Sequence, residues 1–83
     1  MINGTNNEYD IFHEIADEVF GTRKAIRMTQ VELEEKSGVT NQTISHIENG
    51  SSNPSIKVLQ LIADGLGKRL SVKFVDFEGG NEV

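Results

Sequence analysis

Apolar residues recur at helical steps of three and four through the first third of the chain. Asp10 can cap a helix where this run begins, and Gly21 interrupts the run, which predicts a kink or a break there. Phe12 and Phe20 are expected in the core. The pattern predicts an N-terminal helix. The residues that form it are Ile11, Phe12, Ile15, Val19 and Ile26.

Two more short helices, joined by a tight turn, are predicted in the stretch TQVELEEKSGVTNQTISHIENG. Thr29 and Glu32 have the spacing of a capping box, in which side chain and backbone bond reciprocally. Gly38 supplies the left-handed residue that closes a helix, and Thr40 can cap the helix that follows. Two helices separated by a short turn containing glycine form the outline of a helix-turn-helix motif.

The second helix of this motif has one apolar and one polar face. Ile44 and Ile47 lie three residues apart and are expected to point inward. Asparagine and glutamine can bond adenine bidentately in the major groove of DNA, so the polar face can read bases. Solvated polar residues on a surface helix are the plain alternative, and the turn, the caps and the spacing favour the DNA interpretation. The outward residues are Asn41, Gln42, Ser45, His46 and Asn49.

A further helix is predicted after the loop GSSNPS, whose Ser51 and Ser52 can touch phosphate. Ser55 caps this helix and Gly67 closes it. Two more apolar residues lie off its apolar face, which indicates either a second contact surface or a broad buried stripe. These two are Val58 and Leu61, and the face itself holds Ile56, Leu59, Ile62, Ala63 and Leu66.

The segment LSVKFVDF, from Leu70 to Phe77, alternates apolar and polar residues and predicts a strand. An isolated strand leaves both edges unpaired, so it needs a mate. The same strand of a second copy, across a twofold axis, is the simplest mate. A fifth helix or a disordered tail is the alternative. The residues expected at this dimer contact are Leu70, Val72, Phe74, Val75 and Phe77.

Charge is divided unevenly along the 83 residues, which carry a net charge of −5. Residues 19–75 hold all eight Lys and Arg against five acids, and are therefore net positive by three charges. A modestly basic body with acidic ends can still bind DNA. The chain has no cysteine, no apolar run long enough for a membrane span and no signal-peptide layout, which predicts a soluble, cytoplasmic protein that associates with the nucleoid through DNA.

The chain resembles the lambda-repressor-like (Xre/Cro) helix-turn-helix family from about Val19 to Gly67. The residues that carry the resemblance are Thr29-Gln30, Leu33, Gly38-Val39, Ile44-Ser45, Ile47-Glu48-Asn49-Gly50 and Asn53-Pro54-Ser55. The resemblance implies a mainly all-α fold, a compact bundle of four to five helices that binds operator DNA as a dimer. The C-terminal strand resembles the HipB-type antitoxin branch, whose terminal strands pair in the dimer.

Site roles follow from the matching positions. Arg23 matches an arginine that pairs with the glutamate at Glu48 and stays near phosphate. Glu34 departs from the family pattern, which usually has a small alanine where the two helices cross. The N-termini of the helices at Gln30 and Asn41 present N–H groups that suit phosphate. The implied base-reading residues are Asn41, Gln42 and His46, and those near phosphate are Gln30, Thr40, Thr43 and Asn49.

These observations divide the chain into a disordered segment (1–9), a helix-turn-helix DNA-binding domain (10–69), a dimerisation strand (70–77) and an acidic tail (78–83). The predicted function is a dimeric, sequence-specific DNA-binding regulator, with repression as the family expectation. The alternative is an antitoxin that neutralises a partner toxin and controls its own operon.

An enzyme is not predicted. Ser45 and His46 are adjacent and project about 100° apart on a helix, so they cannot pair as nucleophile and base. His13 and His46 lack the spacing of metal ligands, and no glycine-rich phosphate loop is present. No cofactor or metal is therefore expected.

Overall fold

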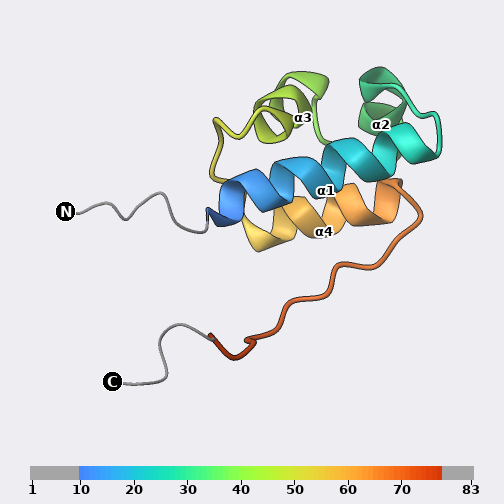
Figure 1. The fold of residues 1–83 in the computed structure, drawn as a ribbon. Coiled ribbons are helices and arrows are strands. Elements are labelled where there is room, and N and C mark those ends of the chain that lie inside the picture. The colour runs from blue at the N-terminus through green and yellow to red at the C-terminus, as the bar shows by residue number, and fades with distance from the viewer. Residues whose placement is uncertain (1–9, 78–83) are drawn as a thin grey trace.

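Four helices make up the fold of the part of the chain that the structure describes. The computed structural model describes residues 10–77, with α1 (Ile11–Ala25), α2 (Gln30–Ser37), α3 (Asn41–Glu48) and α4 (Ile56–Gly65). α2 contacts both α3 and α4, and α1 contacts α3 (Figure 1). The mainly helical fold predicted from the sequence is confirmed for this part of the chain.

Each helix begins at a short polar side chain that accepts a backbone N–H, as predicted. The capping box is complete, since the Glu32 N–H bonds Thr29 Oγ1 at 3.0 Å and the Thr29 N–H bonds Glu32 Oε1 at 2.8 Å. Gly38, with φ of 80°, closes α2 in the left-handed conformation. The capping residues are Asp10, Thr29, Thr40 and Ser55.

The break predicted as one possibility at Gly21 does not occur, because α1 continues through this residue to Ala25. Glycine weakens a helix by only about 1 kcal/mol relative to alanine. Val19 and Arg23, on either side of Gly21, are both buried, and their packing holds the helix together across it.

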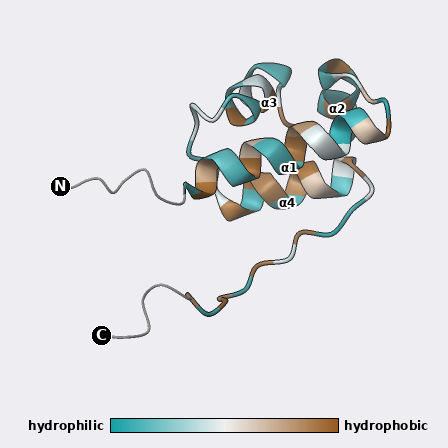
Figure 2. Ribbon diagram, in the orientation of Figure 1, coloured by the Kyte–Doolittle hydropathy of each residue, from teal (hydrophilic) through white to brown (hydrophobic). Residues whose placement is uncertain are grey.

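The core lies where the apolar faces of the helices meet (Figure 2). Val58 and Leu61 pack against it partly buried, so the broad buried stripe is the correct interpretation of α4. Gly65 allows α4 to approach α2 closely, since a Cβ there would lie 2.9 Å from Ser37 Cβ and 3.0 Å from Leu33 Cδ1. The buried cluster consists of Val19, Leu33, Val39, Ile44, Ile47, Ile62 and Leu66.

Phe20 is not a core residue, contrary to the prediction, and is 47% exposed. The preceding residue on α1, Val19, points into the core, so Phe20 points toward the surface. Two cations lie over its ring, with Arg23 Cζ 5.5 Å and Lys24 Nζ 5.8 Å from the ring centroid. The ring therefore attracts both cations electrostatically through its negative face.

Residues 70–77 leave the end of α4 as an extended segment without helix (Figure 1). Val72, Phe74, Val75 and Phe77 are exposed there, and Leu70 is half-buried. A strand is defined by hydrogen bonds to a neighbour, so the predicted pairing with a second copy stays a prediction. The predicted disordered segment 1–9 and acidic tail 78–83 lie outside the described residues.

Candidate nucleic-acid interface

The turn between α2 and α3 is fixed by local hydrogen bonds. Ser37 Oγ accepts the Val39 N–H at 3.0 Å, and Val39 is buried in the core. Thr40 Oγ1 accepts the Thr43 N–H at 3.2 Å and donates to Thr43 Oγ1 at 3.0 Å. The direction in which α3 leaves the turn is therefore set by residues 37–43.

The inner face of α3 anchors the helix to the core. Ile44 and Ile47 are 0% and 1% exposed. Because these two side chains are fully enclosed, the opposite face of α3 must point away from the protein. Gln42, His46 and Asn49 lie exposed on that side, and Asn41 and Thr43 are half-buried at its start.

The loop after α3 is ordered by Asn49. Its Oδ1 accepts the Ser51 N–H at 3.2 Å and the Ser51 hydroxyl at 2.6 Å. Ser51 Oγ also lies 3.3 Å from the His46 carbonyl oxygen. These bonds use the Asn49 oxygen and not its amide nitrogen. Ser51 is exposed and Ser52 is half-buried, so the loop extends the polar surface of α3.

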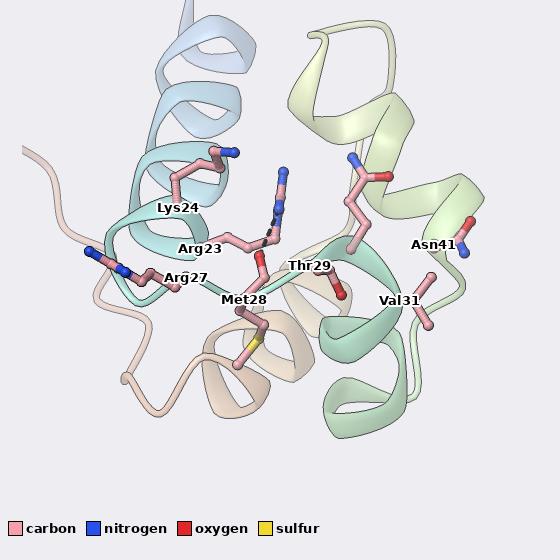
Figure 3. Close-up of a pocket in the computed structure, with 8 residues that line it drawn as sticks. Arg23, Lys24, Arg27, Met28, Thr29, Val31 and Asn41 are labelled. Atoms are coloured by element: carbon pink, nitrogen blue, oxygen red, sulfur yellow. Dashed lines mark hydrogen bonds between the residues drawn. The ribbon is translucent and has the colours of Figure 1, made fainter.

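A buried ion pair joins α1 to the end of α3. Arg23 Nε and Nη2 donate to Glu48 Oε2 and Oε1 at 2.7 and 2.8 Å, as a bidentate pair. Arg23 Nη1 donates to the Met28 carbonyl at 2.8 Å (Figure 3). Gln30 Nε2 donates to Glu48 Oε1 at 3.1 Å. The Arg23 and Glu48 side chains are 8% and 6% exposed, and the predicted pair is confirmed.

The ion pair shifts the pKa of each partner so that its charged form is favoured. The hydrogen bond to Glu48 raises the pKa of Arg23 against the opposing effect of burial. Burial alone would raise the pKa of Glu48, but hydrogen bonds from Arg23 and Gln30 and the charges of Arg23 and Lys24 outweigh it, so the pKa is lowered. Both groups are therefore charged at neutral pH.

We expect the lowered Glu48 pKa to make folding stability depend on pH in acid. Below the unfolded glutamate pKa of about 4.3, the unfolded chain binds a proton that the native carboxylate still excludes, so stability falls as pH falls to the native pKa. Chemical denaturation from pH 7 to pH 2 measures this slope. Glu48→Gln should flatten it, whereas Glu35→Gln, at an exposed carboxylate on α2, should not. Equal slopes for the native chain and Glu48→Gln would contradict the assignment.

A basic hollow of about 500 Å³ lies between the end of α1 and the starts of α2 and α3 (Figure 3). Arg23, Lys24 and Arg27 line it, and Glu48 offsets the positive charge of Arg23. Sequence reasoning missed Lys24 and Arg27 because nothing in their spacing relates them to α2 or α3. Arg27 has a φ of 59°, a left-handed conformation that is uncommon for arginine. The other lining residues are Met28, Thr29, Gln30, Val31 and Asn41.

The N-terminus of α3 differs from the expected phosphate site. The Asn41 N–H bonds Glu34 Oε1 at 3.3 Å, so it is already used within the protein. The Gln30 side chain, expected near phosphate, is half-buried and bonded to Glu48 while it also lines the basic hollow. The hollow at the start of α2 is therefore better suited to an anion than the start of α3.

Other kinds of site find no support within residues 10–77. There, no three His, Cys, Asp or Glu side chains are grouped so as to hold a metal ion. None of the four helices in the described part of the chain has the length and apolarity that a lipid bilayer requires.

The chain belongs to the helix-turn-helix family HTH_3, which matches residues 22–73. It is 46% identical over 46 residues to an uncharacterized HTH-type transcriptional regulator of Methanothermobacter thermautotrophicus, and the match covers 55% of this chain and 67% of that protein. It is 31% identical over 67 residues to antitoxin HigA1 of Mycobacterium tuberculosis, over 81% of this chain and 45% of the antitoxin.

A solved structure shares the fold. It is the restriction-modification controller protein C.Esp1396I, a tetramer in complex with its natural 35-base-pair operator. The TM-score is 0.70 with 34% sequence identity, over 74% of this chain and 80% of that chain. The lambda-repressor-like arrangement expected from the sequence is thereby confirmed.

Proposed function

We propose that this protein is a sequence-specific DNA-binding repressor that inserts α3 in the major groove as a homodimer. The observation that carries the proposal is the exposed polar face of α3, which is held outward by the buried Ile44 and Ile47 and tied to α1 through Glu48. A helix fixed at both ends presents its side chains to base edges with little loss of conformational entropy on binding. Family membership and the operator complex of C.Esp1396I support the same function.

Three side chains on this face are proposed to read bases. Gln42 and Asn41 suit adenine, because an amide can donate to N7 and accept from N6 together. His46 lies one turn further along α3 from Gln42 and is exposed. Asn41 is half-buried at the rim of the basic hollow, so it reaches a base near the phosphate backbone.

Phosphate contacts are proposed on both sides of α3. On one side lie Arg23, Lys24, Arg27 and Gln30, around the basic hollow. The three bonds of Arg23 use three of its five N–H donors, and Arg23 is one of the residues that line the hollow. On the other side, Asn49 has an amide nitrogen that its bonds to Ser51 do not use. The remaining proposed contacts are Thr40, Thr43, Ser51 and Ser52.

A homodimer would place two α3 helices in successive major grooves, with half-site centres about 34 Å apart. The C-terminal segment 70–77 is the proposed dimer contact, because four of its five apolar side chains are exposed in a single chain. Repression is the proposed effect, since a dimer that covers two grooves excludes other proteins from that operator. We place the protein in the cytoplasm for this role and assign it no catalytic activity.

Replacing Gln42 with alanine tests the readout. We expect the change to weaken binding to the preferred duplex by about 1–3 kcal/mol and to relax preference at one base pair. The preferred duplex can be selected from a random-sequence library and compared with a scrambled duplex by fluorescence anisotropy. Gln60→Ala, at an exposed glutamine on α4, is the matched control. An unchanged ratio of preferred to scrambled affinity would show that Gln42 does not read a base.

A second function is favoured by one observation, the similarity to antitoxin HigA1 over 81% of this chain. In this reading the protein also neutralises a toxin, and the exposed segment 70–77 is available to a partner. Purification of the untagged chain from its native host, under conditions that preserve complexes, tests it. A stoichiometric second protein would support an antitoxin, whereas homodimer alone would contradict that role.

A further inference from the structure

Glu34 occupies the crossing of α2 and α3, where the family resemblance leads one to expect a small alanine. It is half-buried, and its Oε1 accepts the backbone N–H of Asn41, the first residue of α3, at 3.3 Å. The bond spans seven residues of sequence and joins the two helices of the motif directly. Neither ion pair found within residues 10–77, Asp10–His13 or Arg23–Glu48, involves Glu34, so no cation is seen paired with its carboxylate there.

We infer that Glu34 is a positioning residue with two effects on DNA binding: it fixes the first turn of α3, which makes the protein selective, and it repels phosphate from that end of the helix, which limits affinity for all DNA. The inference rests on the proposed DNA-binding function and adds to it. The two effects act in different ways. A fixed first turn favours the preferred sequence, whereas an unpaired negative charge weakens binding to every sequence alike.

The first turn of α3 is held from two sides. Thr40 binds the N–H of Thr43, and Glu34 binds the N–H of Asn41. A helix begins with N–H groups that have no partner in the helix, and these two bonds satisfy two of them. Gln42, the proposed base-reading residue, lies between Asn41 and Thr43. Its direction therefore depends on both bonds.

The charge of Glu34 acts at the place where a helix usually attracts an anion. The N-terminus of a helix carries about half a positive charge, and a carboxylate bonded there offsets it. Asn41 also lines the basic hollow, so the carboxylate is bonded to a residue of the proposed phosphate site. Repulsion there lowers affinity for the phosphate backbone of every duplex by the same factor, and selectivity comes from the fixed first turn of α3.

Two substitutions separate the effects. Glu34→Gln keeps an oxygen that can accept the Asn41 N–H and removes the charge. We expect it to raise affinity for the selected and the scrambled duplex alike, by about three- to tenfold at low salt, with their ratio unchanged. Glu34→Ala removes the bond as well. We expect the same gain on scrambled DNA, and a ratio of selected to scrambled affinity that falls about three- to tenfold.

Amide hydrogen exchange of Asn41 in the DNA-free protein gives a readout that does not depend on DNA binding. Exchange should stay slow in Glu34→Gln and become faster in Glu34→Ala. Glu35→Gln removes the same charge from the next, exposed position of α2 and should change scrambled-duplex affinity less than Glu34→Gln does. Circular dichroism confirms that all three variants fold.

Three results would overturn the inference. One is an unchanged Asn41 exchange rate in Glu34→Ala, and another is an unchanged scrambled-duplex affinity in Glu34→Gln. The third is an equal gain in Glu35→Gln, which would assign the effect to net charge alone. If the proposed DNA-binding function itself is wrong, the native chain will enrich no sequence from the random-sequence library. That outcome differs from the three results above.

Discussion

Replacing Arg23 with alanine is expected to lower the free energy of unfolding by about 3–5 kcal/mol. The substitution leaves the Glu48 carboxylate, 6% exposed, with the Gln30 side chain as its remaining hydrogen-bond donor within residues 10–77. It also removes the bond that Arg23 Nη1 donates to the Met28 carbonyl. Breaking a buried ion pair from one side costs more than the pair contributes, because an uncompensated charge stays inside.

The loss expected in Arg23→Ala is large relative to the total free energy of unfolding. A domain of this length has about 5–15 kcal/mol of stability in all, so the variant should lose a large share of it. Urea denaturation of the purified protein measures the loss. Lys24→Ala, at the exposed neighbour of Arg23 on α1, should change stability by no more than about 0.5 kcal/mol.

A double variant checks the physical reason. Arg23→Met combined with Glu48→Leu removes both charges and keeps apolar volume, so it should be much more stable than Arg23→Ala. If Arg23→Ala and Lys24→Ala lose equally little, the pair is not energetically important. If the double variant is less stable than Arg23→Ala, the cost does not arise from an unpaired charge.

The caps and turns of this fold were predictable because they depend on neighbouring residues. The capping box at Thr29 and Glu32, the left-handed Gly38 and the cap at Thr40 each use partners within a few positions. Such short-range chemistry can be read from a single chain. It located α2 and α3, and with them the polar face that carries the proposed function.

Features that depend on distant partners were less accessible to sequence reasoning. On α1 the side chains of Val19 and Arg23 are buried, whereas Phe20 is exposed. No local sequence pattern shows which of these neighbouring residues points into the core. Lys24 and Arg27 join the basic hollow only because α1 ends beside the starts of α2 and α3. Arg23 and Glu48 lie 25 residues apart, and only the family resemblance pointed to their pairing.

The contact made by Glu34 was also inaccessible to sequence reasoning. The sequence marked it as a departure from the family pattern at the crossing of the two helices. It could not show that the carboxylate accepts the first N–H of α3, because that contact depends on how two helices cross. The position of the unusual residue was therefore predictable from the sequence, whereas the hydrogen bond that it makes was not.

Replacing Phe74 with aspartate should dissociate the proposed homodimer. Phe74 is 105% exposed in the single chain, so the change should leave the folding of the monomer intact. In a paired segment each copy would bring one carboxylate into the apolar contact, where an unpaired charge is costly. We expect the dimer dissociation constant to rise at least about 100-fold, measured by sedimentation velocity over a concentration series.

Loss of the dimer should also weaken operator binding strongly, because each half-site then binds one monomer alone. Linking two binding modules increases overall affinity by about 10²–10⁴-fold, and a monomer forgoes that gain. Ser71→Asp adds the same charge on the side of the segment that carries Val75 and Phe77. Because Ser71 is not itself a proposed contact, this variant should weaken the dimer much less than Phe74→Asp does. A Phe74→Asp protein that stays dimeric and binds the selected duplex like the native chain would exclude residues 70–77 as the dimer contact. Dissociation in both variants would instead point to general charge repulsion along the segment, and the pairing of apolar side chains across a twofold axis would have to be abandoned.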